Sequence, residues 1–180
     1  MNDLKIIFTG PVGCGKTTAI VTLSDEKPVG TNQNASDMTR VRKSATTVAM
    51  DYGTMSLDGK EKIHLYGTPG HERFDFMWDV LTKNGLGLIL LLDHTRRDPL
   101  NDMTFFLDSF KDFINSTAVA VGITQTNIVP LTKIDQYYRK MKERGVKGAV
   151  FEVDARSFTD MSHLVQALLF TIDPGLECSA

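Results

Sequence analysis

Gly10-Pro-Val-Gly-Cys-Gly15-Lys16-Thr17 is the stretch that decides the fold of this chain. It follows an apolar run, Leu4 to Thr9, and leads into a segment of helical period that ends near Leu23. The pattern G-x-x-x-x-G-K-[ST] between a strand and a helix is typical of a phosphate-binding loop, or P-loop. Its glycines let backbone N–H groups point at a phosphate, and the helix N-terminus adds positive potential. The stretch therefore predicts an α/β domain that binds phosphate.

Individual residues of this loop have expected roles. Lys16 should reach the β- and γ-phosphates of a nucleotide and take part in catalysis, and the Thr17 hydroxyl should ligate Mg²⁺. We expect Cys14 to fill space in the loop rather than to act as a redox switch. The predicted nucleotide contacts in this region are Gly13, Cys14, Gly15, Lys16, Thr17 and Thr18.

Composition narrows the class of protein. The 180 residues suit one domain, 1–180, and a net charge of −2 gives no electrostatic case for binding nucleic acid or an anionic membrane. Cys14 and Cys178 are too few and too far apart for a disulfide framework, so we expect a reducing compartment. The longest apolar run, Leu86 to Leu92, is too short to span a bilayer, and no lipid anchor can be recognised. These features predict a cytoplasmic protein.

Apolar runs alternate with segments of helical period along the whole chain, which is typical of a parallel sheet covered on both faces. Asp58-Gly59 is a hairpin dipeptide, so we expect one antiparallel pair beside it. The prediction is a mostly parallel six-stranded sheet with one antiparallel edge strand and helices on both faces. Strands are expected at Leu4–Thr9, 48–57, 62–66, 86–92, 117–124 and 149–153, and helices at 16–23, 103–114, 134–141 and 161–169.

Several stretches together resemble the Ras-like small GTPases, and most of all their bacterial branch, the conservon-type and gliding-polarity GTPases. The stretches are Gly10–Thr17, Thr46–Gly53, Leu65–Phe74 and Phe151–Arg156. The resemblance implies a P-loop NTPase of the small GTPase fold that binds GTP or GDP with Mg²⁺. It also implies a molecular switch that hydrolyses GTP slowly.

The same resemblance assigns roles near the γ-phosphate. It makes Thr47 a second Mg²⁺ ligand, with the adjacent Thr46 as a competitor. It also makes Gly70 a backbone donor to the γ-phosphate and His71 the residue that orients the attacking water. Arg42, with Arg40 nearby, is a candidate for a guanidinium supplied from within the chain. Gly67 stands where the common motif has an aspartate that holds Mg²⁺ through water, which predicts weaker metal binding. Val12, where fast hydrolysers have glycine, also predicts slow turnover.

Two segments are candidates for recognising the purine base of the nucleotide. Thr132–Asp135 fits the guanine motif T/N-K-x-D, but it runs directly into the next predicted helix. We favour Thr124, Gln125 and Asn127, because they follow the predicted strand 117–124. Asn127 can accept only one of guanine's two adjacent hydrogens, so weak guanine selectivity is expected. After the last strand, the resemblance predicts that Asp154, Ala155 and Arg156 contact the base, with the Ala155 N–H donating to O6.

The partner expected from the resemblance is a roadblock-type regulator, or another GTPase-activating or effector protein, bound to the switch regions. A run of large residues follows Gly70, in the second of the two segments expected to respond to the γ-phosphate. These residues, among them Phe76 and Trp78, are candidates for the partner-binding surface. Packing of the same residues against the sheet is an equal alternative. The protein alone is predicted to be a monomer. The alternative function is a nucleotide-binding regulatory module with negligible catalysis or relaxed base specificity.

Overall fold

The computed structural model describes residues 4–26, 51–57, 61–69, 77–131 and 133–173. Within these residues six strands form one sheet in the order β2-β3-β1-β4-β5-β6. The strands are β1 Leu4–Thr9, β2 Asp51–Leu57, β3 Glu61–Gly67, β4 Gly87–Asp93, β5 Val119–Thr124 and β6 Gly148–Glu152. The helices are α1 Lys16–Leu23, α2 Trp78–Thr82, α3 Pro99–Ser109, α4 Lys111–Ser116, α5 Asp135–Glu143 and α6 Phe158–Ile172.

The predicted mixed sheet is confirmed. Five of the strands run parallel to one another: β3, β1, β4, β5 and β6. The sixth, β2, pairs with β3 and is antiparallel to it. The parallel strands therefore end at one common edge, and β2 begins there. In the β2–β3 register Asp51 lies opposite Gly67. This carboxyl edge is where open α/β sheets bind their ligands.

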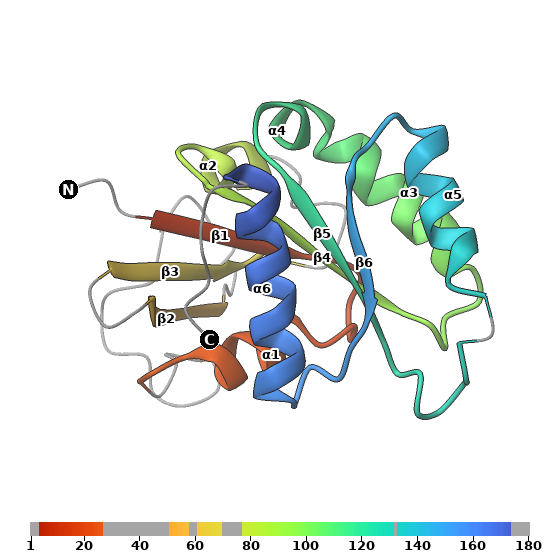
Figure 1. Cartoon of the computed structure of the whole chain (residues 1–180), viewed down its shortest axis with the longest axis horizontal. Coiled ribbons are helices and arrows are strands. Elements are labelled where there is room, and N and C mark those ends of the chain that lie inside the picture. The colour runs from red at the N-terminus through yellow and green to blue at the C-terminus, as the bar shows by residue number, and fades with distance from the viewer. Residues whose placement is uncertain (1–3, 27–50, 58–60, 70–76, 132, 174–180) are drawn as a thin grey trace, which may run out of the picture.

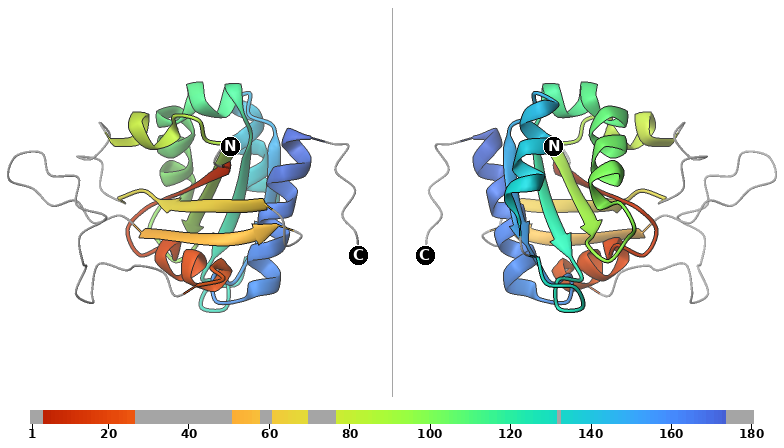
Figure 2. Two further views of the ribbon diagram at one scale, coloured as in Figure 1. Left: turned by 90° about the vertical axis from the view of Figure 1, so that its left-hand side faces the viewer. Right: turned by 90° about the vertical axis from the view of Figure 1, so that its right-hand side faces the viewer.

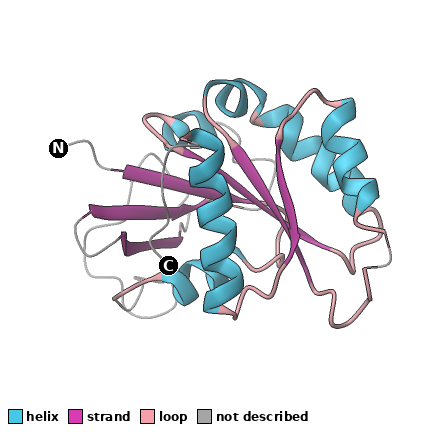
Figure 3. Ribbon diagram, viewed as in Figure 1, coloured by secondary structure: helices cyan, strands magenta, loops and turns pink. Residues whose placement is uncertain are grey.

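Two apolar layers enclose the sheet (Figures 1 and 3). On one face α1 and α6 pack against the strands through side chains such as Ile20 and Leu164. On the other face α2, α3, α4 and α5 bury a second cluster that includes Trp78, Phe106 and Tyr137. The side views in Figure 2 show these two helical layers separated by the sheet. The central strand β4 is almost entirely apolar because both its faces are covered.

The structure differs from the sequence prediction at two places. The helix expected over 103–114 is two helices, α3 and α4, which meet at Phe110. Phe110 lies between the two helices with φ −103° and ψ 15°, so the backbone leaves the helical conformation there although the apolar period continues. Its side chain is buried and stacks on Trp78 with 4.8 Å between ring centroids. Trp78 itself is only 4% exposed. For Trp78 the structure therefore shows the packing that the sequence offered as the equal alternative to a partner surface, whereas Phe76 lies outside the described residues.

Among the described residues, no helix has both the length and the apolar character needed to cross a bilayer.

Candidate functional site

The candidate site lies at the carboxyl edge of the sheet, where three connecting segments converge. The glycine-rich loop after β1 leads into α1, and the other two segments follow β5 and β6. Together they line a pocket of about 700 Å³. Its lining residues are Cys14, Gly15, Thr18, Thr124, Gln125, Thr126, Asn127, Ile128, Glu152, Val153, Asp154, Ala155, Arg156 and Asp160.

The loop after β1 has a backbone that requires glycine. Gly10, Gly13 and Gly15 have φ angles of 141°, 80° and 105°, a region that side chains rarely adopt. A Cβ at Gly10 would also lie 2.1 Å from the carbonyl oxygen of Leu91 in β4. The close approach of loop and strand depends on the missing side chain. Gly15 immediately precedes α1, so the loop delivers its backbone to a helix N-terminus.

Lys16 is buried inside this loop. Its Nζ donates hydrogen bonds to the carbonyl oxygens of Gly10 at 2.8 Å and Pro11 at 2.9 Å, and lies 3.7 Å from the sulfur of Cys14. Within the part of the chain that the structure describes, no carboxylate forms an ion pair with it. The Lys16 residue is 8% exposed, and among the described residues its ammonium group contacts neutral acceptors alone. A buried cation without a counter-ion is well placed to attract an anion.

Cys14 is almost completely buried beside Lys16. Burial raises the pKa of its thiol, because a thiolate would lose hydration there; the nearby Lys16 acts in the opposite direction. A thiol with a raised pKa is a poor nucleophile. These properties agree with the expectation that Cys14 fills space.

Thr17 faces outward from the first turn of α1. Its hydroxyl donates to the Oδ2 of Asp51, at 2.5 Å, from the start of β2. Thr17 is exposed and Asp51 half-buried. A hydroxyl and a carboxylate are the oxygen donors that Mg²⁺ prefers. The described residues contain no cluster of three or more His, Cys, Asp or Glu side chains that could hold a metal alone.

The segment after β5 is attached firmly to the glycine-rich loop. The hydroxyl of Thr124, which is buried, donates to the carbonyl oxygen of Cys14 at 2.9 Å and lies 3.2 Å from that of Leu92. Gln125 then turns the chain with a φ of 63°. Asn127 is exposed at the pocket. β5 therefore places the predicted residues Thr124, Gln125 and Asn127 around one pocket with the loop.

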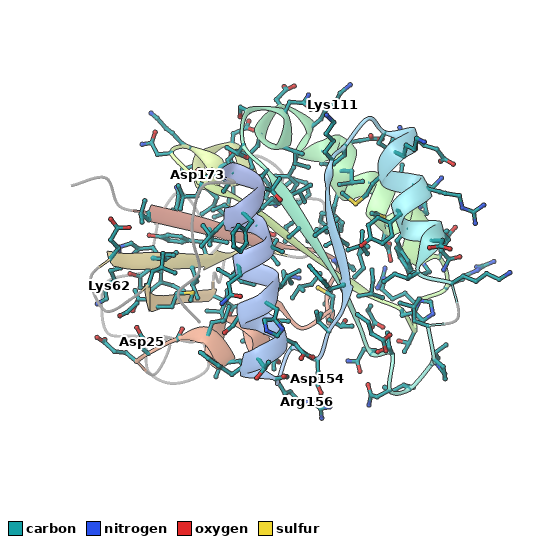
Figure 4. All side chains as sticks on the ribbon, in the orientation of Figure 1. Asp25, Lys62, Lys111, Asp154, Arg156 and Asp173 are labelled. Carbon is teal, nitrogen blue, oxygen red and sulfur yellow. The ribbon has the colours of Figure 1, made fainter. Side chains whose placement is uncertain are left out.

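The segment after β6 forms the opposite wall. Arg156 pairs with Asp154 through its Nε at 2.9 Å and its second guanidinium nitrogen at 2.7 Å, as Figure 4 shows at the start of α6. This arginine holds the pKa of the Asp154 carboxyl at about 2, mainly through the side-chain hydrogen bonds. Ala155 is buried between them and lines the pocket.

Asp135 belongs to Thr132–Asp135, the alternative segment for recognition of the base. It begins α5 and is not among the residues that line this pocket. Thr132 lies outside the described residues, as do four other predicted site residues, Arg42, Thr47, Gly70 and His71. Their roles stay predictions.

Sequence reasoning missed two contacts at this edge. Asp51 was not considered, although a hairpin centred on Gly59 pairs position 51 with position 67. The hydroxyls of Thr9 and Thr68, both buried, lie 2.8 Å apart and connect the start of the loop to the segment after β3. No sequence signal distinguishes these two threonines from others in the chain.

Comparison with known proteins adds a family. The sequence model of a family described as conserved hypothetical ATP binding protein matches residues 26–147, more than half of this chain. An uncharacterized protein of Methanocaldococcus jannaschii is 32% identical over 95 residues. The aligned part is 53% of this chain and 54% of that protein, so the chain matches about half the length of this curated relative.

The family match corrects the resemblance stated above. The chain matches the ATP-binding family and is not a Ras-like GTPase of the conservon type. The resemblance was misleading because short glycine and threonine motifs recur wherever a protein surrounds phosphate groups with backbone amides. The stretch Gly10–Thr17 lies outside the matched region, so the family match rests on other residues.

Proposed function

Because this chain belongs to the family described as conserved hypothetical ATP binding proteins, we propose that it binds a purine nucleoside triphosphate with Mg²⁺ and hydrolyses it slowly. It is a nucleotide-binding P-loop protein, and the proposal adds the metal, the reaction and the base. The observation that carries the proposal is the buried ammonium group of Lys16, which contacts neutral acceptors and no carboxylate within the described part of the chain, beside an open pocket.

The phosphate end of the ligand belongs at the glycine-rich loop. Backbone N–H groups of Gly13, Cys14 and Gly15 precede the N-terminus of α1, where partial positive charge accumulates. Phosphate oxygens would replace the carbonyl groups of Gly10 and Pro11 as partners of Lys16, and charge-assisted hydrogen bonds are the stronger kind. The loop supplies binding and electrostatic stabilisation together.

The base belongs in the pocket between the segments after β5 and β6. A backbone N–H at Ala155 favours the O6 acceptor of guanine over the amino group of adenine. Asn127, however, offers one acceptor and one donor, whereas guanine presents two adjacent donors. We therefore propose a modest preference for GTP, with ATP bound in the same pocket. The family description, which names ATP, supports the second half of this statement.

Bound Mg²⁺ would neutralise phosphate charge and draw the phosphate oxygens into one geometry. The chain's own contribution is to hold both ends of the ligand. The hydroxyl of Thr17 faces the metal side of the loop, and Thr47 is the second predicted ligand. Lys16 stabilises negative charge as the terminal phosphate leaves, and His71 would orient the attacking water.

We extend this proposal to a molecular switch, in which the conformation depends on the γ-phosphate. Thr47 and Gly70 would both contact the γ-phosphate or its metal ion, so loss of that phosphate would release two segments together. A binding module without catalysis is the competing function. Release of phosphate in a single turnover separates them, because a rate that stays unchanged in His71→Ala would favour the module.

The experiment that tests the proposal starts with purified full-length protein. Mass analysis identifies any nucleotide that co-purifies in the presence of Mg²⁺, and competition binding then ranks GTP, ATP, ITP and CTP. We expect both purine triphosphates to compete, GTP ahead of ATP by about tenfold or less, since one hydrogen bond separates them. A well-folded protein that binds none of the four would contradict the proposal.

A further inference from the structure

Asp51 is the first residue of β2, and its carboxylate lies against the first turn of α1. Its Oδ2 accepts the hydrogen of the Thr17 hydroxyl at 2.5 Å, across 34 positions of sequence. Among the residues that the structure describes, no lysine or arginine forms an ion pair with Asp51. A half-buried carboxylate without a cation, beside a hydroxyl expected to ligate Mg²⁺, has the chemistry of a metal-binding group.

Gly67 explains why this carboxylate can lie there. It is the last residue of β3 and pairs with Asp51 in the antiparallel register. A Cβ at Gly67 would lie 3.0 Å from the Cβ of Asp51 and 3.3 Å from its Oδ2. The Asp51 side chain therefore fills the space that a side chain at position 67 would occupy. There is room for one acidic side chain at this point of the sheet, and it can come from either β3 or β2.

P-loop proteins generally hold Mg²⁺ with the Ser or Thr of the loop and with one further acid. We propose that Asp51 is that acid, supplied by the antiparallel strand β2 in place of an acid on β3. By accepting the Thr17 hydrogen, Asp51 turns the hydroxyl lone pairs toward the ion, and its charge adds to the attraction. This inference rests on the proposed binding of Mg²⁺ and nucleotide. It corrects the expectation that Gly67 weakens metal binding.

Asp93 is the competing acid, because it ends β4 at the same edge of the sheet. Its Oδ1, however, already accepts from the Thr95 backbone N–H at 2.8 Å and from the Thr95 hydroxyl at 2.6 Å. These two bonds hold Asp93 in its own turn. Asp51 alone of the two contacts Thr17.

The test compares nucleotide affinity with and without the metal. Fluorescent, non-hydrolysable analogues of GTP and ATP are titrated into full-length protein, once in excess MgCl₂ and once in excess EDTA. In wild type, Mg²⁺ should strengthen binding. Asp51→Asn should lose about 10- to 100-fold of that gain, the usual cost of removing a group that supports a metal ligand. Its affinity in EDTA should equal that of wild type.

Two matched variants serve as controls. Asp93→Asn should keep the full Mg²⁺ gain. Asp25→Asn makes the same change where a carboxylate accepts from the Ser56 hydroxyl at 2.6 Å, near the other end of β2, and it should also keep the gain. Electron paramagnetic resonance of Mn²⁺ gives a second readout, in which Asp51→Asn should leave more Mn²⁺ free in the presence of the nucleotide analogue.

An exchange of the two positions tests the shared space directly. Asp51→Gly together with Gly67→Asp returns the acid to β3 and removes the Cβ that would crowd it. The nearest remaining atom is then Ile20 Cδ1, 3.1 Å away at the end of a flexible side chain. The double variant should recover Mg²⁺ dependence that Asp51→Gly alone loses. If Asp51→Asn does not fold, the comparison of Asp51→Gly with the double variant tests the proposal instead.

Three results would overturn the proposal. Asp51→Asn could keep the full Mg²⁺ gain, or lose affinity equally in MgCl₂ and EDTA, which would make Asp51 a structural partner of Thr17 only. A folded double variant without Mg²⁺ dependence would count against it in the same way. Wild type that binds neither analogue in either buffer is a different result, because it contradicts the proposed function itself.

Discussion

Lys16 and Asp51 are the two charged side chains that we propose to face the phosphate and the metal ion at this site. Lys16 is a buried cation that contacts neutral carbonyl groups, and Asp51 is a half-buried anion that contacts a neutral hydroxyl. Neither pairs with an opposite charge among the described residues. Unpaired charges are costly inside a folded protein, and their presence at one edge supports the proposal that a ligand pairs them.

Removal of the Lys16 ammonium tests the phosphate side. Lys16→Ala should weaken binding of a nucleoside triphosphate by at least about 100-fold, since charge-assisted bonds to phosphate are worth about 3 kcal/mol together. Fluorescence titration with a labelled analogue measures the loss. Lys140→Ala, which removes a lysine paired with Glu143 on the surface of α5, is the matched control and should bind as wild type does. Equal affinity in both variants would contradict the P-loop assignment.

Asn127 tests the base side. Asn127→Asp should raise the preference for GTP over ITP by about tenfold, because a carboxylate can accept from both N1 and N2 of guanine and ITP lacks the second donor. Competition binding measures the ratio. Asp135→Asn is the control, and it should leave the ratio unchanged. A response to Asp135→Asn alone would transfer base recognition to Thr132–Asp135.

At the scale of elements, the glycine-rich loop approaches β4 closely at Gly10. Gly10 and Gly13 both have positive φ, but of the two only Gly10 lacks room for a Cβ, which would lie 2.1 Å from the Leu91 carbonyl oxygen and 2.8 Å from Cys14 Sγ. At Gly13 no atom lies within 4 Å of the added Cβ. Substitution at Gly13 therefore measures backbone strain alone, whereas substitution at Gly10 measures strain together with a steric collision.

Gly13→Ala should lower the free energy of unfolding by about 1 kcal/mol, the cost of a positive φ. Gly10→Ala adds a collision with backbone that cannot rotate away, so its cost should be at least about 3 kcal/mol. Urea unfolding followed by the fluorescence of Trp78, the chain's single tryptophan and a buried one, measures both values. Equal losses would show that the loop and β4 do not pack as described.

At the scale of the whole molecule, Tyr137 connects the outer helical layer to the sheet edge. Its side chain is fully buried in α5, and its hydroxyl lies 2.8 Å from His94 Nδ1, just after β4. Burial raises the pKa of the Tyr137 phenol to about 12, because the phenolate would lose hydration. In the unfolded chain the phenol ionises near its ordinary pKa of about 10.

Stability should therefore fall in alkali. Below pH 10 the phenol is neutral in both states and the stability is complete; between pH 10 and 12 only the unfolded chain ionises, which favours unfolding. Urea unfolding across this window should show a decline that is smaller in Tyr137→Phe than in wild type. A decline of the same slope in both proteins would contradict the assignment.

Much of the fold was predictable because apolar period and turn residues are local signals. β1 and α1 begin where the sequence predicted, and β5, Val119–Thr124, lies within the strand predicted over 117–124. The break at Phe110 was not predicted, and burial of Trp78 was only one of two alternatives. The two rings stack on each other although they lie 32 positions apart in the sequence, and no local pattern encodes such a contact.

The sequence by itself determined the P-loop, the mixed sheet and the candidate residues that follow β5 and β6. These depend on glycines that accept unusual φ angles and on side-chain periods of two and 3.6, which are properties of neighbouring residues. The tertiary structure alone decided which acid meets Thr17. Asp51 reaches that hydroxyl because β2 runs antiparallel to β3, so its first residue arrives at the edge where the parallel strands end.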